Sequence, residues 1–252
     1  MIHVKSASEL DKMRQAGHIV AEVLERMREC VAPGVTTQGL NEAAEEVIRK
    51  RGVIPSFKGY PPGSRYPFPA SICVSVNEEL VHGIPGPRVL QEGDIVSIDV
   101  GAIYQGYHGD AGVTLPVGAI SAEAQQLLAV TEGALYAAIA RARAGNRTGD
   151  VSAAIQQHVE QQGCNVVREY TGHGIGRQMH EPPQIPNYGS QGQGAKLHAG
   201  MTVAIETMVL AGDYPVRVLD DHWTVVSADG RLTAYFEHTI SIQDGSAEIL
   251  TQ

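Results

Sequence analysis

The sequence has too few cysteines for a disulfide framework. Its three cysteines, Cys30, Cys73 and Cys164, are odd in number and lie far apart. Small secreted domains stabilised by disulfides carry even sets of cysteines at closer spacing. A reducing compartment therefore fits this chain best, and we expect a cytoplasmic protein.

Long apolar runs are also missing. The first residues, MIHVKSASELDKMRQ, are polar and lack the hydrophobic region of a secretory signal. No uninterrupted apolar run approaches the roughly 20 residues that span a membrane. A formal net charge of -9 argues against nonspecific binding to DNA or to an anionic membrane surface. We therefore expect neither DNA nor a membrane as a partner.

Several catalytic patterns are absent. The chain has no G-x-S-x-G nucleophile elbow, no Gly-rich phosphate loop and no cysteine motif that indicates a reactive thiolate. These absences disfavour serine, phosphoryl-transfer and cysteine chemistry. Together with the acidic balance of the chain, they favour an amide carbonyl as the electrophile of any hydrolysis.

An acid-bearing stretch is present at Leu90–Asp110. Apolar residues alternate there with polar ones, which predicts a strand whose polar side carries Asp99. A hairpin centred near Tyr104 and Gln105, with Gly106 helping the turn, would bring Asp99 roughly opposite Asp110. Like charges at that distance repel, and the stretch from Gly93 to Asp110 contains no Lys or Arg, so a bound metal is the simplest neutraliser. The alternative is a solvated hairpin with two surface acids.

Helical spacing of apolar residues predicts four helices. We expect the first to be capped by Ser8, the second by Thr37 with Gly52 just past its end, and the third by Ser121. The fourth is predicted from Asp150 to Gly163.

A loop rich in Pro, Gly and aromatics, SFKGYPPGSRYPFPAS, precedes a strand predicted at Ile72–Val76. It contains Phe57, Tyr60, Tyr66 and Phe68, more aromatics than a plain linker carries. They form either a pocket wall or simple hydrophobic anchors.

The chain contains an internal repeat. LQEGDIVSID at Leu90–Asp99 matches LHAGMTVAIE at Leu197–Glu206, with Leu, Gly, Val, Ile and an acid at the same offsets. Each half is helix, helix, strand and acid-bearing strand. We therefore expect one catalytic domain over residues 1–252, built from halves at about 8–119 and 120–245 around a pseudo-twofold axis. The alternative, chance similarity of two buried strands, does not explain why both end in a carboxylate.

A second hairpin is predicted at Trp223–Ile240, with Asp229-Gly230 as its turn and Glu237 on the returning strand. The symmetry of the halves then brings four carboxylates together, those of Asp99, Asp110, Glu206 and Glu237. Without Lys or Arg, such a cluster loses several kcal/mol unless it is protonated or binds metal.

His173 is the candidate imidazole ligand beside these acids. A lone His is more often structural, but its glycine neighbours leave room for close approach. Carboxylates with one imidazole suit two divalent ions, of Mn, Fe(II), Co or Zn, better than a Cys-rich structural zinc site. Such a pair can acidify a bridging water and polarise a carbonyl, as in aminopeptidases. His82 and His180 also lie next to turn-forming residues.

Six segments together carry a family resemblance. They are VSVNEELVHGIP, EGDIVSIDVG, YHGDAG, GHGIGRQMHEPPQIPNYG, MTVAIETM and YFEHTI. In this order and spacing they resemble the methionine aminopeptidases over essentially the whole chain. The resemblance implies the pita-bread α/β (α+β) fold, in which two pseudo-twofold halves form a central, curved antiparallel sheet covered by helices. The short stretch between Glu206 and Glu237 lacks the insertion of the second family type, which implies the first, bacterial type.

The resemblance also implies roles for individual residues. Asp110 and Glu237 would bridge two metal ions, and Glu206 would shuttle the proton of the nucleophilic water. His180 would help to stabilise the tetrahedral intermediate, and His82 would contact the scissile amide or the leaving nitrogen. The implied metal ligands are Asp99, Asp110, His173, Glu206 and Glu237.

A pocket for the methionine side chain is implied at Phe57, Tyr60, Phe68, Cys73, Met179 and Trp223, beside His82 and His180. Phe57 replaces a smaller residue of the family and Met179 replaces an aromatic one. The segment Pro61–Pro67 is longer than usual. These changes exchange volume within an apolar pocket, which should still accept a thioether.

We therefore expect a metal-dependent aminopeptidase that removes the initiator methionine from nascent proteins and prefers a small second residue. Its expected partners are peptides and nascent chains that begin with Met, and a transient ribosome contact is compatible with this; we expect a monomer. The nearest alternative is an X-Pro aminopeptidase or prolidase, which usually carries an additional N-terminal domain. A non-catalytic binding module of the same fold is disfavoured because all five ligand positions are occupied by acids or histidine.

Overall fold

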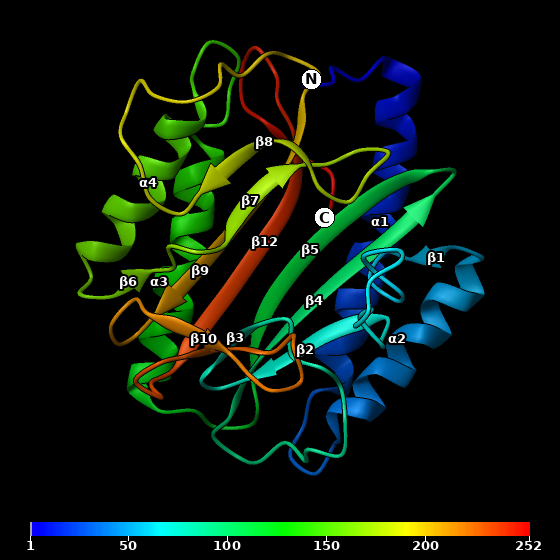
Figure 1. Ribbon diagram of the computed structural model, residues 1–252, viewed down its shortest axis with the longest axis vertical. Helices are drawn as coiled ribbons and strands as arrows, with labels where there is room; N and C mark the ends of the chain where they lie inside the picture. The colour runs from blue at the N-terminus through cyan, green and yellow to red at the C-terminus, as the bar shows by residue number, and fades with distance from the viewer. Residues whose placement is uncertain (1) are drawn as a thin grey trace.

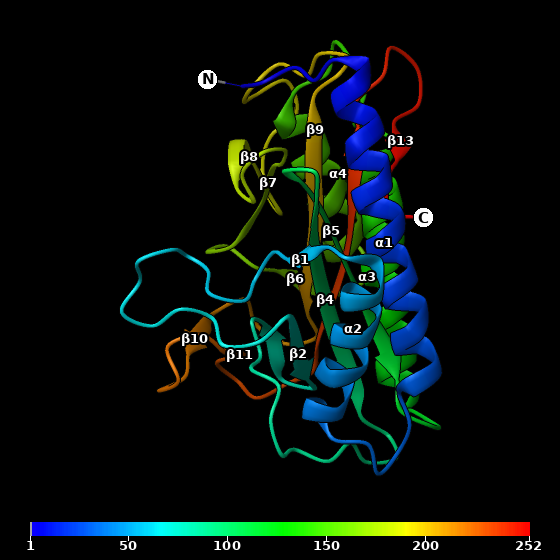
Figure 2. The same cartoon turned by 90° about the vertical axis from the view of Figure 1, so that its right-hand side faces the viewer.

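The computed structural model describes residues 2–252 and contains one large, curved sheet with helices on one face (Figure 1). The helices are α1 (Ala7–Cys30), α2 (Thr37–Arg51), α3 (Ala122–Ile139) and α4 (Thr148–Glu160). In Figure 2, where the sheet is seen nearly edge-on, the helices lie to its right, while long loops project from its other face to the left. The open face of the sheet is therefore available for a site.

The large sheet is antiparallel throughout, in the order β1-β4-β5-β12-β9-β7-β8, with β2, β6 and β13 pairing at its sides. A small sheet has the order β10-β11-β3. The strands are β1 (Ile54–Pro55), β2 (Ile72–Val76), β3 (Glu79–Val81), β4 (Ile95–Tyr104), β5 (Tyr107–Pro116), β6 (Asn165–Val166), β7 (Thr171–Gly174), β8 (Glu181–Pro186), β9 (Thr202–Leu210), β10 (Val216–Val218), β11 (Val225–Ser227), β12 (Thr233–Ser241) and β13 (Glu248–Ile249).

The two related halves meet in the middle of this sheet. The first half contributes the hairpin β4–β5, covered by α1, and the second contributes β9–β12, covered by α3. Pairing of β5 with β12 joins them. The core lies between sheet and helices, and side chains such as Val23 and Leu127 are almost wholly buried there. Each such side chain contributes about 1.5–3 kcal/mol through removal of apolar surface from water. The predicted α/β architecture is confirmed.

One predicted hairpin is wrong. The turn at Asp229-Gly230 forms, but β11 pairs with β10 and β3, whereas β12 pairs with β9, β5 and β13. The reason is the length of the available partners. β12 pairs with β9 over nine residues, from Thr233–Leu210 to Ser241–Thr202, while β11 is only three residues long. The longer ladder forms more backbone hydrogen bonds and buries more apolar surface.

The helices occur where they are predicted, with shifts at their first residues. Ser121 caps α3, and Gly52 ends α2 in the left-handed conformation, as expected. The other three helices begin slightly earlier in the sequence than predicted. Ser6, not Ser8, caps α1; Thr36, not Thr37, caps α2; and α4 begins at Thr148, not Asp150.

These shifts have one physical cause. The backbone N–H of Ser6 donates to the Glu9 carboxylate, and that of Arg147 donates to Asp150, each at third position from the cap. The side chain of Thr36 accepts from the N–H of Gly39. In all three helices a hydrogen bond across the first turn selects the cap among adjacent polar residues; at α4, the acid that reaches back, Asp150, is the residue at which the helix was predicted to begin.

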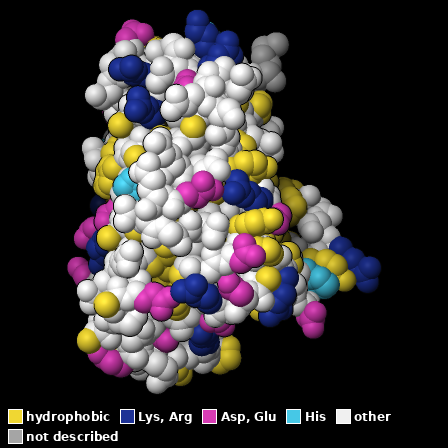
Figure 3. Space-filling model, turned by 90° about the vertical axis from the view of Figure 1, so that its left-hand side faces the viewer, with side chains coloured by type: hydrophobic (Ala, Val, Ile, Leu, Met, Phe, Trp, Pro, Cys, Tyr) yellow, Lys and Arg dark blue, Asp and Glu magenta, His cyan; other side chains and the backbone are white. Residues whose placement is uncertain are grey.

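The surface carries charges of both signs. On the face drawn in Figure 3, basic and acidic side chains are interspersed over the body of the molecule. Among the described residues, no helix is long and apolar enough to cross a membrane.

A buried ion pair fastens the N-terminal segment to the second half. Lys5 is 2% exposed at its side chain, and its Nζ lies 2.9 Å from Oε2 of Glu181, the first residue of β8. The backbone N–H of Lys5 also donates to the carbonyl of Gly200 at 2.8 Å. Removal of one partner leaves the other charge poorly solvated, which is costly.

We expect Lys5→Met to lower the free energy of unfolding by about 3 kcal/mol at pH 7, measured by urea denaturation. Burial raises the pKa of Glu181, but hydrogen bonds from Lys5 and from the N–H of Gln178 outweigh it, so the pKa lies below its usual 4.5. A lowered carboxyl pKa stabilises the fold above pH 4.5, and this stabilisation is lost as the pH falls through the folded-state value. The difference between variant and parent should therefore shrink below pH 4.5.

A matched control exists in the same chain. Lys58 and Glu45 form an exposed pair at the same 2.9 Å distance. Lys58→Met should change stability by less than about 1 kcal/mol. Equal losses for both variants would contradict a special role for the buried pair.

Candidate metal centre and adjoining pocket

The first two acids lie on one face of the β4–β5 hairpin. Asp99 pairs with Gly112, and Asp110 pairs with Gly101. The register thus differs by two residues from the predicted one, because Gln105 and Gly106 form a two-residue turn between Tyr104 and Tyr107. The carboxylates are diagonal neighbours and not directly opposite. A shift of two residues keeps both on the same face of the sheet.

The second pair of acids faces the first across the join of the halves. Glu206 and Glu237 are directly paired on β9 and β12, and Glu237 also pairs with Gly112 of β5. Asp99, Gly112, Glu237 and Glu206 therefore form one row across four strands. A Cβ on Gly112 would lie 2.1 Å from Cε1 of Tyr235, so glycine is needed for the tyrosine ring to occupy this space. The Tyr235 hydroxyl donates to Oε2 of Glu237 at 2.5 Å.

His173 reaches the same face from β7. Its Nε2 lies 3.3 Å from Oε1 of Glu206 and 3.8 Å from Oδ2 of Asp110. Its Nδ1 lies 2.8 Å from the carbonyl oxygen of Gly174. A carbonyl oxygen only accepts, so Nδ1 carries a proton and donates to it, and Nε2 is the ring nitrogen that faces the acids. This is the arrangement that a metal-ligating histidine adopts.

The acid cluster lacks neutralising partners. Asp99 Oδ1, Asp110 Oδ1 and Glu237 Oε1 are buried without a hydrogen bond from the described residues. Burial, followed by the neighbouring carboxylates, raises the pKa of Asp99, Asp110 and Glu237 well above its usual value. Among the residues that line the cavity, none is Lys or Arg.

This donor set fits divalent metal. Asp110, His173 and Glu237 each offer one ligand atom, and the three atoms lie within 4.8 Å of one another. Asp99 and Glu206 flank this group, on β4 and β9. Oxygen donors with one imidazole suit hard or borderline divalent ions. The alternative, a solvated hairpin with Asp99 and Asp110 as surface acids, is wrong, since Asp110 is 3% exposed and Oδ1 of Asp99 is buried at the cavity.

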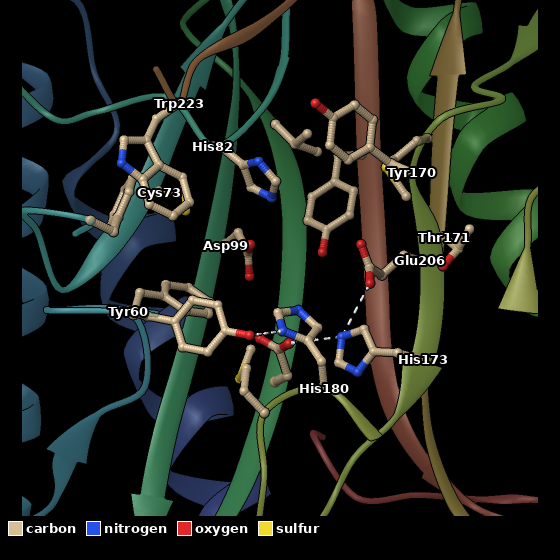
Figure 4. A pocket seen from close by; sticks show the side chains of 17 residues that line it. Tyr60, Cys73, His82, Asp99, Tyr170, Thr171, His173, His180, Glu206 and Trp223 are labelled. Carbon is tan, nitrogen blue, oxygen red and sulfur yellow. Dashed lines mark hydrogen bonds and ion pairs between the residues drawn. The ribbon is translucent and has the colours of Figure 1, made fainter. Parts of the chain in front are cut away.

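An apolar pocket opens beside the acids (Figure 4). The loop between β1 and β2 contributes three aromatics, β2 contributes Cys73, the β7–β8 loop contributes Met179, and the β10–β11 loop contributes Trp223. Of the two alternatives for the aromatic loop, a pocket wall is therefore correct for three of its aromatics. All eight predicted side-chain and histidine positions line the cavity: Phe57, Tyr60, Phe68, Cys73, His82, Met179, His180 and Trp223. Tyr66 does not line it; its ring stacks on His222, outside.

Two cavity histidines, His82 and His180, are harder to protonate than a free imidazole. Burial lowers the pKa of His82. Burial, together with the nearby His173, lowers the pKa of His180 to about 3. Burial and then the acids raise the pKa of the Cys73 thiol, which agrees with the absence of a thiolate motif. Neutral imidazoles can donate one hydrogen bond each without adding charge.

Five lining residues were not predicted from the sequence: Val81, Tyr170, Thr171, Met208 and Tyr235. Tyr235 lies two residues before Glu237 on the same strand, so strand periodicity could have placed both side chains on one face. The same periodicity applies to Met208, two residues after Glu206 on β9, and to Thr171, two residues before His173 on β7. Val81 and Tyr170 carry no such signal.

Comparisons with known proteins agree with this geometry. The sequence profile of metallopeptidase family M24 matches residues 11–244. Methionine aminopeptidase 1 of Bacillus subtilis is 52% identical over 100% of both chains. Methionine aminopeptidase of Clostridium perfringens is 51% identical over 100% of this chain and 99% of the relative.

Solved structures give the same result. A methionine aminopeptidase from Thermotoga maritima superposes with a TM-score of 0.97, at 49% identity and over 100% of both chains. A prolidase from Pyrococcus furiosus superposes with a TM-score of 0.80 at 20% identity, over 99% of this chain and 65% of the prolidase. The second likeness shows the shared pita-bread fold alone.

Proposed function

Because this chain belongs to metallopeptidase family M24 and is an aminopeptidase of that family, we propose that it hydrolyses the bond after the N-terminal methionine of new proteins. The observation that carries the proposal is the set of buried carboxylates without cationic partners, next to an apolar pocket. A single catalytic domain over residues 1–252, with halves at about 8–119 and 120–245, is part of the proposal.

Two divalent ions would be held by Asp99, Asp110, His173, Glu206 and Glu237, with Asp110 and Glu237 between them. When bound, such ions lower the pKa of a water molecule and polarise a peptide carbonyl. The central row of Glu237 and Glu206, with Asp110 on the adjoining hairpin, supports a shared site in which both halves contribute ligands.

Glu206 is the proposed proton carrier. Its side chain lines the cavity and is 15% exposed, so it is more accessible from the cavity than the side chain of Asp110. It would accept a proton from the attacking water and deliver it to the leaving amine. Neutral His180 would donate to the oxygen that becomes negative, and His82 would contact the scissile amide or the leaving nitrogen.

The methionine side chain would occupy the apolar pocket. Phe57, Phe68, Cys73 and Met179 pack into one buried cluster with Trp223 at its side. Aromatic edges and a flexible Met accommodate a thioether well, and sulfur–aromatic contacts add to the binding. Phe57 and Met179 change the shape of this pocket and not its apolar character, which supports methionine over a charged first residue.

The substrate proposal predicts an order of cleavage rates. Met-Ala peptides should be cleaved faster than Met-Lys peptides, because a small second residue is preferred, and faster than Leu-Ala peptides. Product analysis by liquid chromatography would measure kcat/KM for each. Faster cleavage of Leu-Ala or of an X-Pro peptide would contradict the proposal, and no cleavage of any of them would favour the binding-module alternative.

The number and identity of the ions are tested separately. Metal analysis after anaerobic purification should find two equivalents per chain, and reconstitution with Mn, Fe(II), Co and Zn would rank the ions. Nascent chains as substrates, a transient ribosome contact, a monomeric state and a cytoplasmic location stay predictions.

A further inference from the structure

A hydrogen bond joins the two sides of the cavity beside the acids. The Tyr60 hydroxyl lies 2.7 Å from Nδ1 of His180, and their rings are 5.3 Å apart. Tyr60 comes from the first half and His180 from the second. Figure 4 shows this bond at the lower rim of the pocket, with the other ring nitrogen of His180 turned toward the space between Asp99 and Glu206.

The bond specifies which nitrogen of His180 carries its proton. A neutral imidazole has one N–H and one lone pair, so the partner of Nδ1 decides the state of Nε2. Burial raises the pKa of Tyr60, so its phenol keeps the proton. His180 Nδ1 is the single hydrogen-bond partner of that hydroxyl among the described residues. The hydroxyl is therefore satisfied when it donates to Nδ1, which leaves the proton of His180 on Nε2.

The two tautomers of His180 differ in what they offer a substrate. With the proton on Nε2, the ring can donate a hydrogen bond into the cavity. The opposite tautomer would offer a reacting carbonyl oxygen no donor from His180.

The backbone around Tyr60 holds its hydroxyl in position. The N–H of Gly59 donates to the carbonyl of Phe68, the N–H of Phe68 donates to the carbonyl of Tyr60, and the N–H of Tyr60 donates to the carbonyl of Phe57, all at 2.8–2.9 Å. These bonds close the base of the Pro61–Pro67 loop, which projects from the open face of the sheet in Figure 2. The ring of Tyr60 thus extends from a closed base and not from a free loop.

We propose that Tyr60 is a positioning residue, whose hydroxyl donates to Nδ1 of His180 and so leaves Nε2 as the nitrogen that donates to the oxygen of the scissile carbonyl. This inference rests on the proposed function for its catalytic consequence, but the tautomer itself does not depend on it. Tyr60 therefore does more than line the methionine pocket, since it couples the pocket wall to the donor that stabilises developing negative charge.

The test compares Tyr60→Phe with Tyr66→Phe, which removes a hydroxyl from the same loop outside the cavity. In Tyr60→Phe, kcat for a Met-Ala peptide should fall about 10- to 100-fold. This is no more than the fall in kcat expected when one oxyanion donor is removed outright. KM should change less than about threefold. Tyr66→Phe should keep kcat within about twofold.

A spectroscopic readout separates positioning from structural damage. Two-bond proton–nitrogen spectra of zinc-loaded protein labelled with 15N-histidine report which ring nitrogen is protonated, and His180→Gln identifies the signal. The parent should show His180 protonated at Nε2, and Tyr60→Phe should shift it toward a mixture of tautomers. A parent protonated at Nδ1, or an unchanged tautomer and kcat in Tyr60→Phe, would overturn the inference. If the parent cleaves no Met peptide, the proposed function fails, while the spectra still decide the tautomer.

Discussion

Replacement of Glu206 by Gln is expected to lower kcat by about 10³-fold, because the amide keeps the size of the side chain and cannot accept a proton. Glu206 is paired with Glu237 across the join of β9 and β12, and its Oε1 lies 3.3 Å from Nε2 of His173. Steady-state kinetics on a Met-Ala peptide would measure the loss. KM should change little, since the methionine pocket is untouched.

Two measurements isolate the proton-carrying role of Glu206. Metal content of the variant, measured by mass spectrometry, shows how much of the loss comes from weaker metal binding. Glu123→Gln makes the same chemical change at an exposed glutamate paired with Arg231 and should keep full activity. A Glu206→Gln enzyme that keeps more than a tenth of the parent kcat with both ions bound would show that another group moves the proton.

Removal of metal is expected to abolish hydrolysis and to destabilise the fold. Asp99, Asp110 and Glu237 hold oxygens that are buried without hydrogen-bond partners, so the metal-free protein must either keep uncompensated negative charge in its centre or take up protons there, and both cost stability. Saturating metal at about 1,000 times its Kd should raise the free energy of unfolding by about 4 kcal/mol. Denaturant unfolding with and without a chelator would measure the difference.

A variant of the site provides the control for this experiment. Glu237→Gln removes one buried negative charge while its side-chain oxygen can still accept from Tyr235. The metal-free variant should be at least as stable as the metal-free parent, and added metal should stabilise it much less. Equal stability of the parent with and without chelator, together with full activity, would refute the metal centre.

Much of the fold was predictable because its signals are local. Alternation around Asp99 reports a strand, helical spacing reports four helices, and both signals depend on residues a few positions apart. The repeat between Leu90–Asp99 and Leu197–Glu206 adds a second signal, because two segments of similar sequence adopt similar structures. Their symmetric packing then implied that the acids converge.

The errors have a common origin in competition between distant partners. The sequence between Trp223 and Ile240 has a good turn and two alternating strands, yet β12 pairs with β9 and β5 instead of β11. Local pattern reports that a strand exists and not which neighbour offers the longest ladder. The caps at Ser8 and Thr37 were displaced for a related reason, since hydrogen bonds across the first turn select among several adjacent polar residues.

By itself, the amino-acid sequence determined that this chain forms two related α/β halves, each with an acid-bearing strand, and that it resembles a metal-dependent aminopeptidase. Periodicity, repeats and motifs are properties of the order of residues, so they can be recognised without the tertiary structure. Only the tertiary structure decided that Gly112 lies between Asp99 and Glu237 in the row of acids, and that Tyr60 meets His180 across the cavity. Such contacts join residues on separate strands and loops, and they depend on packing and register, which no local pattern encodes.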